Sequence, residues 1–311
     1  MFDLKIVILT RNRPQFIIDC IYSVLESSKK LPLNLKYLIE ISDNSDFDDS
    51  YKLIKEEFNW IQLINRKPCL SAMDHFRIVF SEINSKYFVL FHDDDLMEPN
   101  YLFHLYSILS KNENYAAVGC NGFFMNNGIK LNQTFLNNNV PYTIIKTVKH
   151  LTYNYYGNLN RMYIAPFPGY MYNSSFFKKI NLDILGLGKH SDVAILCELL
   201  ETGYIYWTHE CLITYRLHDN NDSKKFEIID SLNLFFYLRF KNKFKFSKAL
   251  LNFRYNIWSD WIKNNKNLND SKYKISSKYL FNSKLYFLLF DLNFKTDLLK
   301  RLKNKLMKIR R

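Results

Sequence analysis

The chain has 311 residues, enough for one large domain or two smaller ones with a full hydrophobic core. Because 48% of the residues are hydrophobic and 23% are charged, the composition excludes disordered, collagen-like and mucin-like proteins. The net charge is +13, and the excess lies in residues 224–311, which hold 22 basic and 6 acidic residues. A basic tail on a nearly neutral body indicates an anionic partner, either lipid or nucleic acid.

The sequence predicts no targeting or membrane-spanning segment. The longest uncharged run, residues 162–177, is interrupted by two prolines and a glycine, so it does not suit a membrane helix. The apolar run Ile6–Leu9 is too short for a signal peptide and is typical of a strand. We therefore expect a cytoplasmic protein. Its five cysteines are widely spaced without a CxxC pair, which predicts reduced core residues.

Strands and helices alternate in the first 110 residues. The apolar run Lys5–Leu9 predicts a strand, and Pro14 suits the first position of the helix that follows. Ser71 and Asp74 form a capping-box-like pair at the start of another helix. Further strands are expected at Tyr37–Ile41, Trp60–Ile64 and Lys86–Phe91. This alternation predicts an α/β fold, a mostly parallel sheet flanked by helices, with its ligand crevice beyond the carboxyl ends of the strands.

The remaining residues have a less regular pattern. Strands are expected at Tyr115–Gly119, Met162–Ala165 and Tyr204–Trp207, and a helix at about Ser191–Glu201. From Lys224 onward the pattern is mostly helical, rich in Lys and aromatic residues. Such helices suit the interface of an anionic membrane, where apolar side chains enter the lipid and lysines meet the head groups. The alternative is a helical lid that packs on the preceding domain.

His92 and an acidic triplet, Asp93-Asp-Asp95, directly follow the strand expected at Lys86–Phe91. Three adjacent carboxylates repel one another unless a cation lies among them, so the motif favours a Mg²⁺ or Mn²⁺ site. The alternative is an acidic turn before the helix expected at Glu98, although one carboxylate would be enough for capping.

Five segments, in this order, resemble one known family over about residues 3–223. They are IVILTRNRPQFIIDCIYSVLES, ISDNSD at 41–46, FHDDDLMEP at 91–99, GLGKHSDVAILCELLETGY and YRLHDNNDS. Together they resemble the family 2 glycosyltransferases, which are inverting enzymes of the Rossmann-like GT-A fold. The resemblance implies a catalytic domain at 1–223, with a nucleotide-binding half at 1–110 and an acceptor half at 111–223, followed by a basic helical region at 224–311.

The resemblance also implies roles for residues on the donor side. Asp43 would accept the N3–H of a uracil ring, Thr10 and Arg11 would line the nucleotide, and Arg66 would reach the diphosphate. The alternatives are an Asx turn for Asp43 and ordinary polar loops for the others. Many relatives carry an Asn where this chain has Asp74 or His75.

The acidic triplet would hold the sugar nucleotide and its metal ion. Asp93 and Asp94 are assigned to the donor, and Asp95 to a divalent cation, Mn²⁺ or Mg²⁺, that neutralises the leaving diphosphate. His218 stands where the family supplies a late metal or diphosphate contact. The alternative for His218 is an exposed polar residue.

Asp192 would be the general base, because an inverting transfer needs a carboxylate on the face opposite the leaving group. The family's usual Glu-Asp pair is replaced here by Ser191-Asp192, which keeps the base and removes its acidic neighbour. The alternative is a helix-start Asp beside a Ser191 cap. Gly169 and Tyr170 resemble the loop that shapes the acceptor pocket.

The prediction is therefore an inverting transfer of a sugar from a nucleotide-diphosphate donor, UDP-linked, to a hydroxyl of a glycan or lipid-linked acceptor. The resemblance and the basic tail together indicate bacterial surface polysaccharide or lipooligosaccharide synthesis at the inner face of the cytoplasmic membrane, with residues 224–311 in peripheral contact. Two alternatives stay open: a nucleic-acid-binding protein that uses the tail, and a metal-dependent nucleotidyltransferase. A nucleic-acid partner is disfavoured because the body that carries the triplet is net negative.

Overall fold

The structure is a computed structural model that describes residues 1–136, 141–152, 167–219, 221 and 228–241. The chain divides into two compact units, Met1–Arg254 and Tyr255–Arg311, and all the described residues belong to the first. The strand expected at Met162–Ala165 and the helices expected beyond residue 241 lie outside the described residues.

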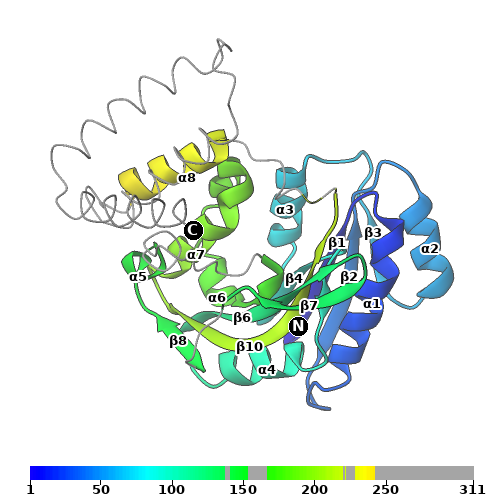
Figure 1. The fold of residues 1–311 in the computed structure, drawn as a ribbon, viewed down its shortest axis with the longest axis horizontal. Helices are drawn as coiled ribbons and strands as arrows, with labels where there is room; N and C mark the ends of the chain where they lie inside the picture. Colours follow the sequence, from blue (N-terminus) through cyan, green and yellow to red (C-terminus); the bar gives the residue numbers. More distant parts are fainter. Residues whose placement is uncertain (137–140, 153–166, 220, 222–227, 242–311) are drawn as a thin grey trace, which may run out of the picture. The chain divides into compact units, whose positions relative to one another are not determined.

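The described residues form one mixed sheet of ten strands in the order β3-β2-β1-β4-β9-β6-β10-β5, with β7 beside β6 and β8 beside β10 (Figure 1). Four pairs are parallel: β1 with β2, β1 with β4, β2 with β3, and β6 with β10. The strands are β1 Leu4–Thr10, β2 Tyr37–Asp43, β3 Gln62–Asn65, β4 Tyr87–His92, β5 Leu96–Met97, β6 Tyr115–Asn126, β7 Ile129–Thr134, β8 Tyr142–Ile145, β9 Tyr170–Asn173 and β10 Tyr204–Leu217.

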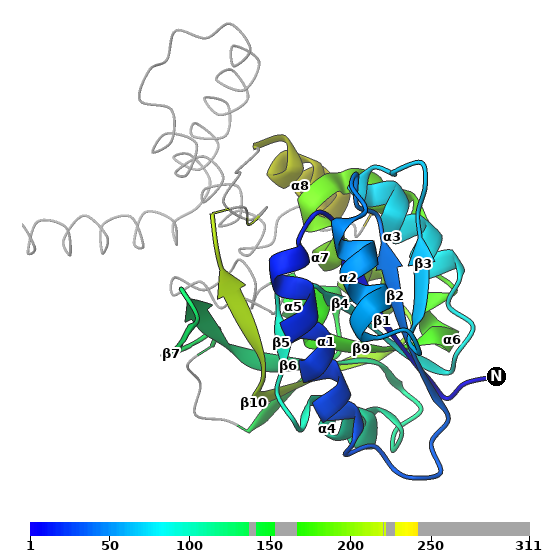
Figure 2. The ribbon, with the colours of Figure 1, turned by 90° about the vertical axis from the view of Figure 1, so that its right-hand side faces the viewer.

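Helices cover both faces of the sheet, as the alternation predicted. Figure 1 shows α4 on one side of β6 and β10, with α6 and α7 on the other, and Figure 2 shows α1 and α2 together beside β1 to β3. The helices are α1 Pro14–Ser28, α2 Asp49–Glu57, α3 Ala72–Ser81, α4 Tyr101–Leu109, α5 Val148–Thr152, α6 Ser174–Phe177, α7 Ser191–Leu199 and α8 Ile228–Lys241, with 3₁₀ segments η2 Phe167–Gly169 and η3 Leu182–His190.

Successive side chains of β4 point to opposite faces of the sheet and pack into the core on both sides. Val89 and Phe91 pack with apolar residues of α1 and α4. On the other face Phe88 stacks on Tyr172 of β9 and meets Phe177 of α6 edge to face. Because both faces of this central strand are buried, residues 88–91 are all apolar, and His92 ends the strand just before the acidic triplet.

Local signals set the helix starts as expected. Pro14 occupies the first turn of α1, and the Ser71 hydroxyl accepts a hydrogen bond from the backbone N–H of Asp74 at 3.2 Å. The third strand begins at Gln62 rather than Trp60, whose side chain is 66% exposed. The strands expected at Tyr115 and Tyr204 continue to Asn126 and Leu217, because they pair with each other along almost their whole length.

A close approach at Gly119 yields a test of the sheet packing. A Cβ at Gly119 would lie 2.4 Å from the Tyr170 ring and 2.7 Å from the Trp207 ring, both of which are buried. We expect Gly119→Ala to lower the free energy of unfolding by about 1–3 kcal/mol, measured by urea denaturation. The control is Gly186→Ala, whose Cβ would meet nothing within 4 Å and should change stability by less than about 0.5 kcal/mol. Equal stabilities for the two variants would contradict this packing.

Candidate active site

The acidic triplet stands where three parallel strands end. Thr10 is paired with Asp43 at the ends of β1 and β2, and the backbone N–H of Asp93 donates to the carbonyl of Leu9 at 3.1 Å. The Thr10 hydroxyl donates to Asp93 Oδ2 at 2.6 Å. The structure therefore brings together Thr10, Asp43 and Asp93, three of the residues expected to hold the donor.

Arg13 compensates the charge of the triplet. Its Nη1 lies 2.9 Å from Asp93 Oδ1 and 2.9 Å from Asp94 Oδ2. All three carboxylates are buried, with Asp95 fully so. Arg13 was not among the residues predicted from the sequence. The pattern that could have indicated it is the second basic residue in Thr10-Arg-Asn-Arg13, in the loop after β1.

Burial and neighbouring charges give the three carboxyl groups of the triplet different pKa values. Burial raises the pKa of Asp93 to about 6 despite the opposing effect of Arg13. Burial opposes ionisation of Asp94 too, but the positive charge of Arg13 and the contact with His218 hold its pKa below the usual value. Burial and the adjacent Asp94 raise the pKa of Asp95 well above its usual value. A cation at Asp95 would reverse that shift, because it favours the charged carboxylate.

The donor atoms around Asp95 fit a divalent metal ion. One nitrogen of His92 and one oxygen each of Asp94 and Asp95 lie within 4.8 Å of one another. Oδ2 of Asp95 is buried and accepts no hydrogen bond from the described residues, so this oxygen is available as a ligand for a cation. Two carboxylates and an imidazole suit Mn²⁺. The two carboxylates also suit Mg²⁺, which prefers oxygen ligands. His92 was not predicted as a ligand from the sequence, although it immediately precedes the triplet.

The end of β10 closes the site from the other half of the domain. His218 Nε2 lies 2.9 Å from Asp94 Oδ2, so His218 contacts the triplet, through Asp94 rather than Asp95. The backbone N–H of Arg216 donates to Asp95 Oδ1 at 3.2 Å, and its Nε donates to the Asp94 carbonyl at 3.1 Å. The Arg216 guanidinium and the His218 ring both lie on Phe16 of α1. Arg216 is a further residue that sequence analysis missed, although it lies within the Tyr-Arg-Leu-His segment.

On the nucleotide side, Asp43 and Arg11 have partners within loops. Asp43 is buried, and its Oδ1 accepts the backbone N–H of Ser45 at 2.9 Å, as in the Asx-turn alternative. That bond leaves the second carboxylate oxygen for a ligand. Arg11 donates through Nη1 to the Leu70 carbonyl at 3.1 Å, lies 3.4 Å from Asp46, and is half exposed. Its backbone N–H is 3.3 Å from Asp93 Oδ2.

Arg66 is not brought to the triplet. Its Nε donates to the Ser42 hydroxyl at 3.0 Å, and its two terminal nitrogens bind the Glu82 carboxylate at the end of α3. Ser42 also lies 2.8 Å from His75 Nε2, and burial next to Arg66 lowers the pKa of His75 to about 4. In this geometry Arg66 ties β2 and β3 to α3 and supports the strand that carries Asp43.

Asp192 lies in the first turn of α7. Burial raises the pKa of its carboxyl to about 6, and its Oδ1 accepts the backbone N–H of Val193 at 2.7 Å. The helix starts at Ser191, so its N-cap is His190 and not Ser191 as in the alternative. The Ser191 hydroxyl donates to the carbonyls of Gly188 and Leu185. Burial, and after it the charge of Asp192, raises the pKa of Tyr172 well above its usual value.

The residues expected at the acceptor pocket belong to the start of β9. Gly169 ends η2 and Tyr170 begins β9, and both are buried. The Tyr170 ring packs against Tyr172 and Trp207. The Tyr101 hydroxyl donates to the carbonyl of Pro168 at 2.6 Å and so fixes this turn from α4.

The sequence of residues 5–174 matches the model of Glycosyl transferase family 2, so the chain belongs to this family and is a glycosyltransferase. Solved structures with a similar fold include residues 1–349 of S. aureus TarS, 12% identical over 81% of this chain and 80% of that one, with a TM-score of 0.53. The same fragment in complex with UDP-GlcNAc is 11% identical over 84% and 81% of the two chains, with a TM-score of 0.54. No curated protein matches the chain. The expected GT-A fold is confirmed.

Removing Arg13 should expose the mutual repulsion of the triplet. We expect Arg13→Met to cost about 3 kcal/mol of unfolding free energy at pH 8 in a chelating buffer, since two buried carboxylates lose their partner. The cost should shrink toward pH 5, because the unpaired carboxyls then bind protons and lose their charge. Urea denaturation at both pH values measures the difference. Arg77→Met, which breaks an exposed pair with Asp74, is the control and should change stability little at either pH. A cost for Arg13→Met that does not vary with pH would contradict the assigned role.

Proposed function

We propose that the chain transfers a sugar, with inversion, from a UDP-sugar to a hydroxyl of a glycan or lipid-linked acceptor. One observation carries the proposal: a buried acidic triplet at the end of β4 lies beside Thr10 and Asp43 at the ends of the neighbouring parallel strands. This is the edge at which open α/β sheets bind nucleotides. TarS, which has a similar fold, has been solved with UDP and with UDP-GlcNAc.

The donor would be held by residues from the first half of the domain. We assign the free oxygen of Asp43 to the N3–H of uracil and the exposed part of Arg11 to the ribose and phosphates. Asp93, fixed by Thr10 and Arg13, would accept a ribose or sugar hydroxyl. The backbone N–H of Arg66 donates to the Asp43 carbonyl at 2.7 Å, but its guanidinium binds Ser42 and Glu82, and we assign it to support of β2.

A divalent cation, Mn²⁺ or Mg²⁺, would be held by Asp94 and Asp95, with His92 as nitrogen donor and His218 orienting Asp94. When bound, it supplies positive charge to the diphosphate as that group leaves. Arg216 would keep Asp95 aimed at the same place through its backbone N–H.

Asp192 would perform the proton transfer. As the bond from the acceptor oxygen to the anomeric carbon forms and the bond to the diphosphate breaks, its carboxylate would take the acceptor's hydroxyl proton. A pKa of about 6 leaves the group mostly ionised at pH 7 yet more basic than an exposed aspartate. Gly169 and Tyr170 would border the acceptor beside it.

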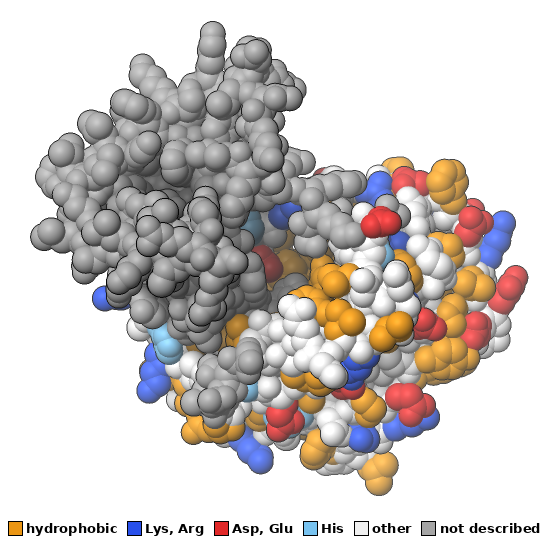
Figure 3. Space-filling view, viewed as in Figure 1, with side chains coloured by type: hydrophobic (Ala, Val, Ile, Leu, Met, Phe, Trp, Pro, Cys, Tyr) orange, Lys and Arg blue, Asp and Glu red, His pale blue; other side chains and the backbone are white. Residues whose placement is uncertain are grey.

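We further propose that the acceptor is borne on a lipid, in bacterial surface polysaccharide or lipooligosaccharide synthesis, and that residues 224–311 contact the inner face of the cytoplasmic membrane. The support is the charge of this region, 22 basic against 6 acidic residues. No helix among the described residues is long and apolar enough to cross a bilayer. On the face drawn in Figure 3, basic and acidic side chains of the described residues are interspersed, which gives no support to a broad nucleic-acid-binding surface.

Nucleotide binding should stabilise the fold in a metal-dependent way. We expect UDP with Mn²⁺ to raise the melting temperature, because a ligand that binds only the folded state stabilises it, by about 2.7 kcal/mol at 100 times its Kd. In Asp95→Asn the metal-dependent part of the rise should vanish. Asp48→Asn, an exposed carboxylate outside the site, is the control. No shift with any uridine nucleotide would refute the donor assignment.

Asp192→Asn should lower the transfer rate by about 10²–10⁴-fold with the fold intact, since it removes the general base. In the wild type, kcat should rise about tenfold per pH unit up to about pH 6 and then level off, because the carboxyl must lose its proton to act. Asp183→Asn, an exposed residue of η3, is the control. Full activity of Asp192→Asn would exclude it as the base.

A further inference from the structure

The helix α8 packs against the segment that carries the proposed base. The family match ends at residue 174, so both α7 and α8 lie beyond it. α8 contacts η3 and α7, and Figure 1 shows it alongside α7. Leu234, Phe235 and Leu238 of α8 are buried. The helix is therefore part of the catalytic unit rather than an independent appendage.

The N-terminal end of α8 meets a backbone bend just before Asp192. Gly188 has φ 75° and ψ −138°, which interrupts η3. Residues with a Cβ disfavour this conformation, whereas glycine adopts it readily. A Cβ at Gly188 would lie 2.0 Å from Asp230 Oδ1, so the Asp230 carboxylate fills the space that the glycine leaves. The bend precedes Asp192 by four residues, and the Ser191 hydroxyl ties it to the first turn of α7 by donating to the Gly188 carbonyl.

A second contact lies further along both helices. The Tyr237 hydroxyl donates to Glu198 Oε1 of α7. Tyr237 follows Asp230 by seven residues, or two helical turns, so both project from the same face of α8. Glu198 lies six residues after Asp192 in the chain. The two contacts therefore hold the base-bearing helix before its first turn and near its end.

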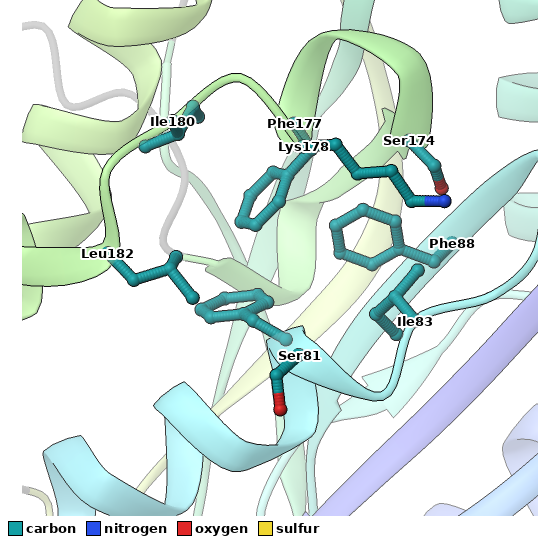
Figure 4. Close-up of a pocket in the computed structure, with 9 residues that line it drawn as sticks. Ser81, Ile83, Phe88, Ser174, Phe177, Lys178, Ile180 and Leu182 are labelled. Carbon is teal, nitrogen blue, oxygen red and sulfur yellow. The ribbon is translucent and has the colours of Figure 1, made fainter.

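A pocket of about 190 Å³ lies beside the start of η3. It is lined by Ile180 and Leu182, by Phe88 of β4 and by Phe177 of α6 (Figure 4). Elsewhere η3 contacts α3, α7 and α8. The helix α8 is therefore one of three helices that bear on the position of η3.

We propose that α8 positions the general base: Asp230 fixes the bend at Gly188 and Tyr237 holds Glu198, so that the Asp192 carboxylate faces the acceptor in one orientation. This rests on the proposed role of Asp192. Asp230 and Tyr237 act through α7 and are positioning residues.

The test compares Asp230→Ala, Tyr237→Phe and the double variant in the full chain. We expect kcat for transfer to fall at least tenfold in the double variant, with the KM for the sugar nucleotide unchanged within twofold, because the donor residues lie on other elements. Asp230→Asn should restore most of the loss of Asp230→Ala, since its amide fills the same space. Amide hydrogen exchange over residues 186–199 should be faster in the impaired variants and unchanged in β1 and β4.

Two matched controls remove similar groups elsewhere. Tyr22→Phe breaks a tyrosine–glutamate hydrogen bond between α1 and Glu57, and Asp49→Ala removes an acidic residue from the first turn of α2. Neither should change kcat or exchange at 186–199. Unchanged kcat in the double variant would overturn the proposal, whether or not exchange rises. A wild-type chain that transfers no sugar would refute the proposed function instead, and exchange at 186–199 would then decide whether α8 restrains the bend.

Discussion

The burial of three consecutive carboxylates is the constraint on which the rest of the site depends. Taking charged groups out of water costs several kcal/mol each unless a partner compensates them. Asp93 and Asp94 share Arg13, Asp94 also has His218, and Asp95 has only the backbone N–H of Arg216 among the contacts described. Positive charge is thus supplied unevenly, and Asp95 is left as the carboxylate with a buried oxygen available to a cation.

This uneven compensation explains how the elements are arranged. The loop after β1 must run over the end of β4 so that Arg13 reaches two aspartates, and α1 must start there so that Phe16 supports Arg216 and His218. β10 must extend far past the strand expected from its apolar residues alone, because its last residues complete the site. The second half of the domain therefore supplies groups to the donor side as well as the proposed base.

The sequence predicted the features of the fold that depend on local residue patterns. The alternation of strands and helices, the Pro14 and Ser71 starts, and the position of the triplet after a buried strand are all confirmed. The roles of Asp43, Asp95 and Asp192 stay predictions. Arg13 and Arg216 were missed because their importance comes from contacts set by strand order, between residues 80 or more positions apart. His92 was missed for a different reason: it stands next to the triplet, but only the structure shows that its ring lies near Asp94 and Asp95. Polar ends of long strands, as at Arg216, resemble loops until their sheet neighbours are known.

The contact between β10 and the triplet also has a consequence for how the protein is made. Arg216 and His218 reach Asp95 and Asp94 across 121 and 124 residues of chain. During synthesis the first half of the sheet emerges well before Arg216 and His218. Until these two residues emerge, Asp94 and Asp95 lack the hydrogen bonds that they provide. Such long-range closure slows folding, because the entropy of a large loop is lost before the contact forms. The donor side of the domain is therefore completed only after almost the whole catalytic unit has left the ribosome.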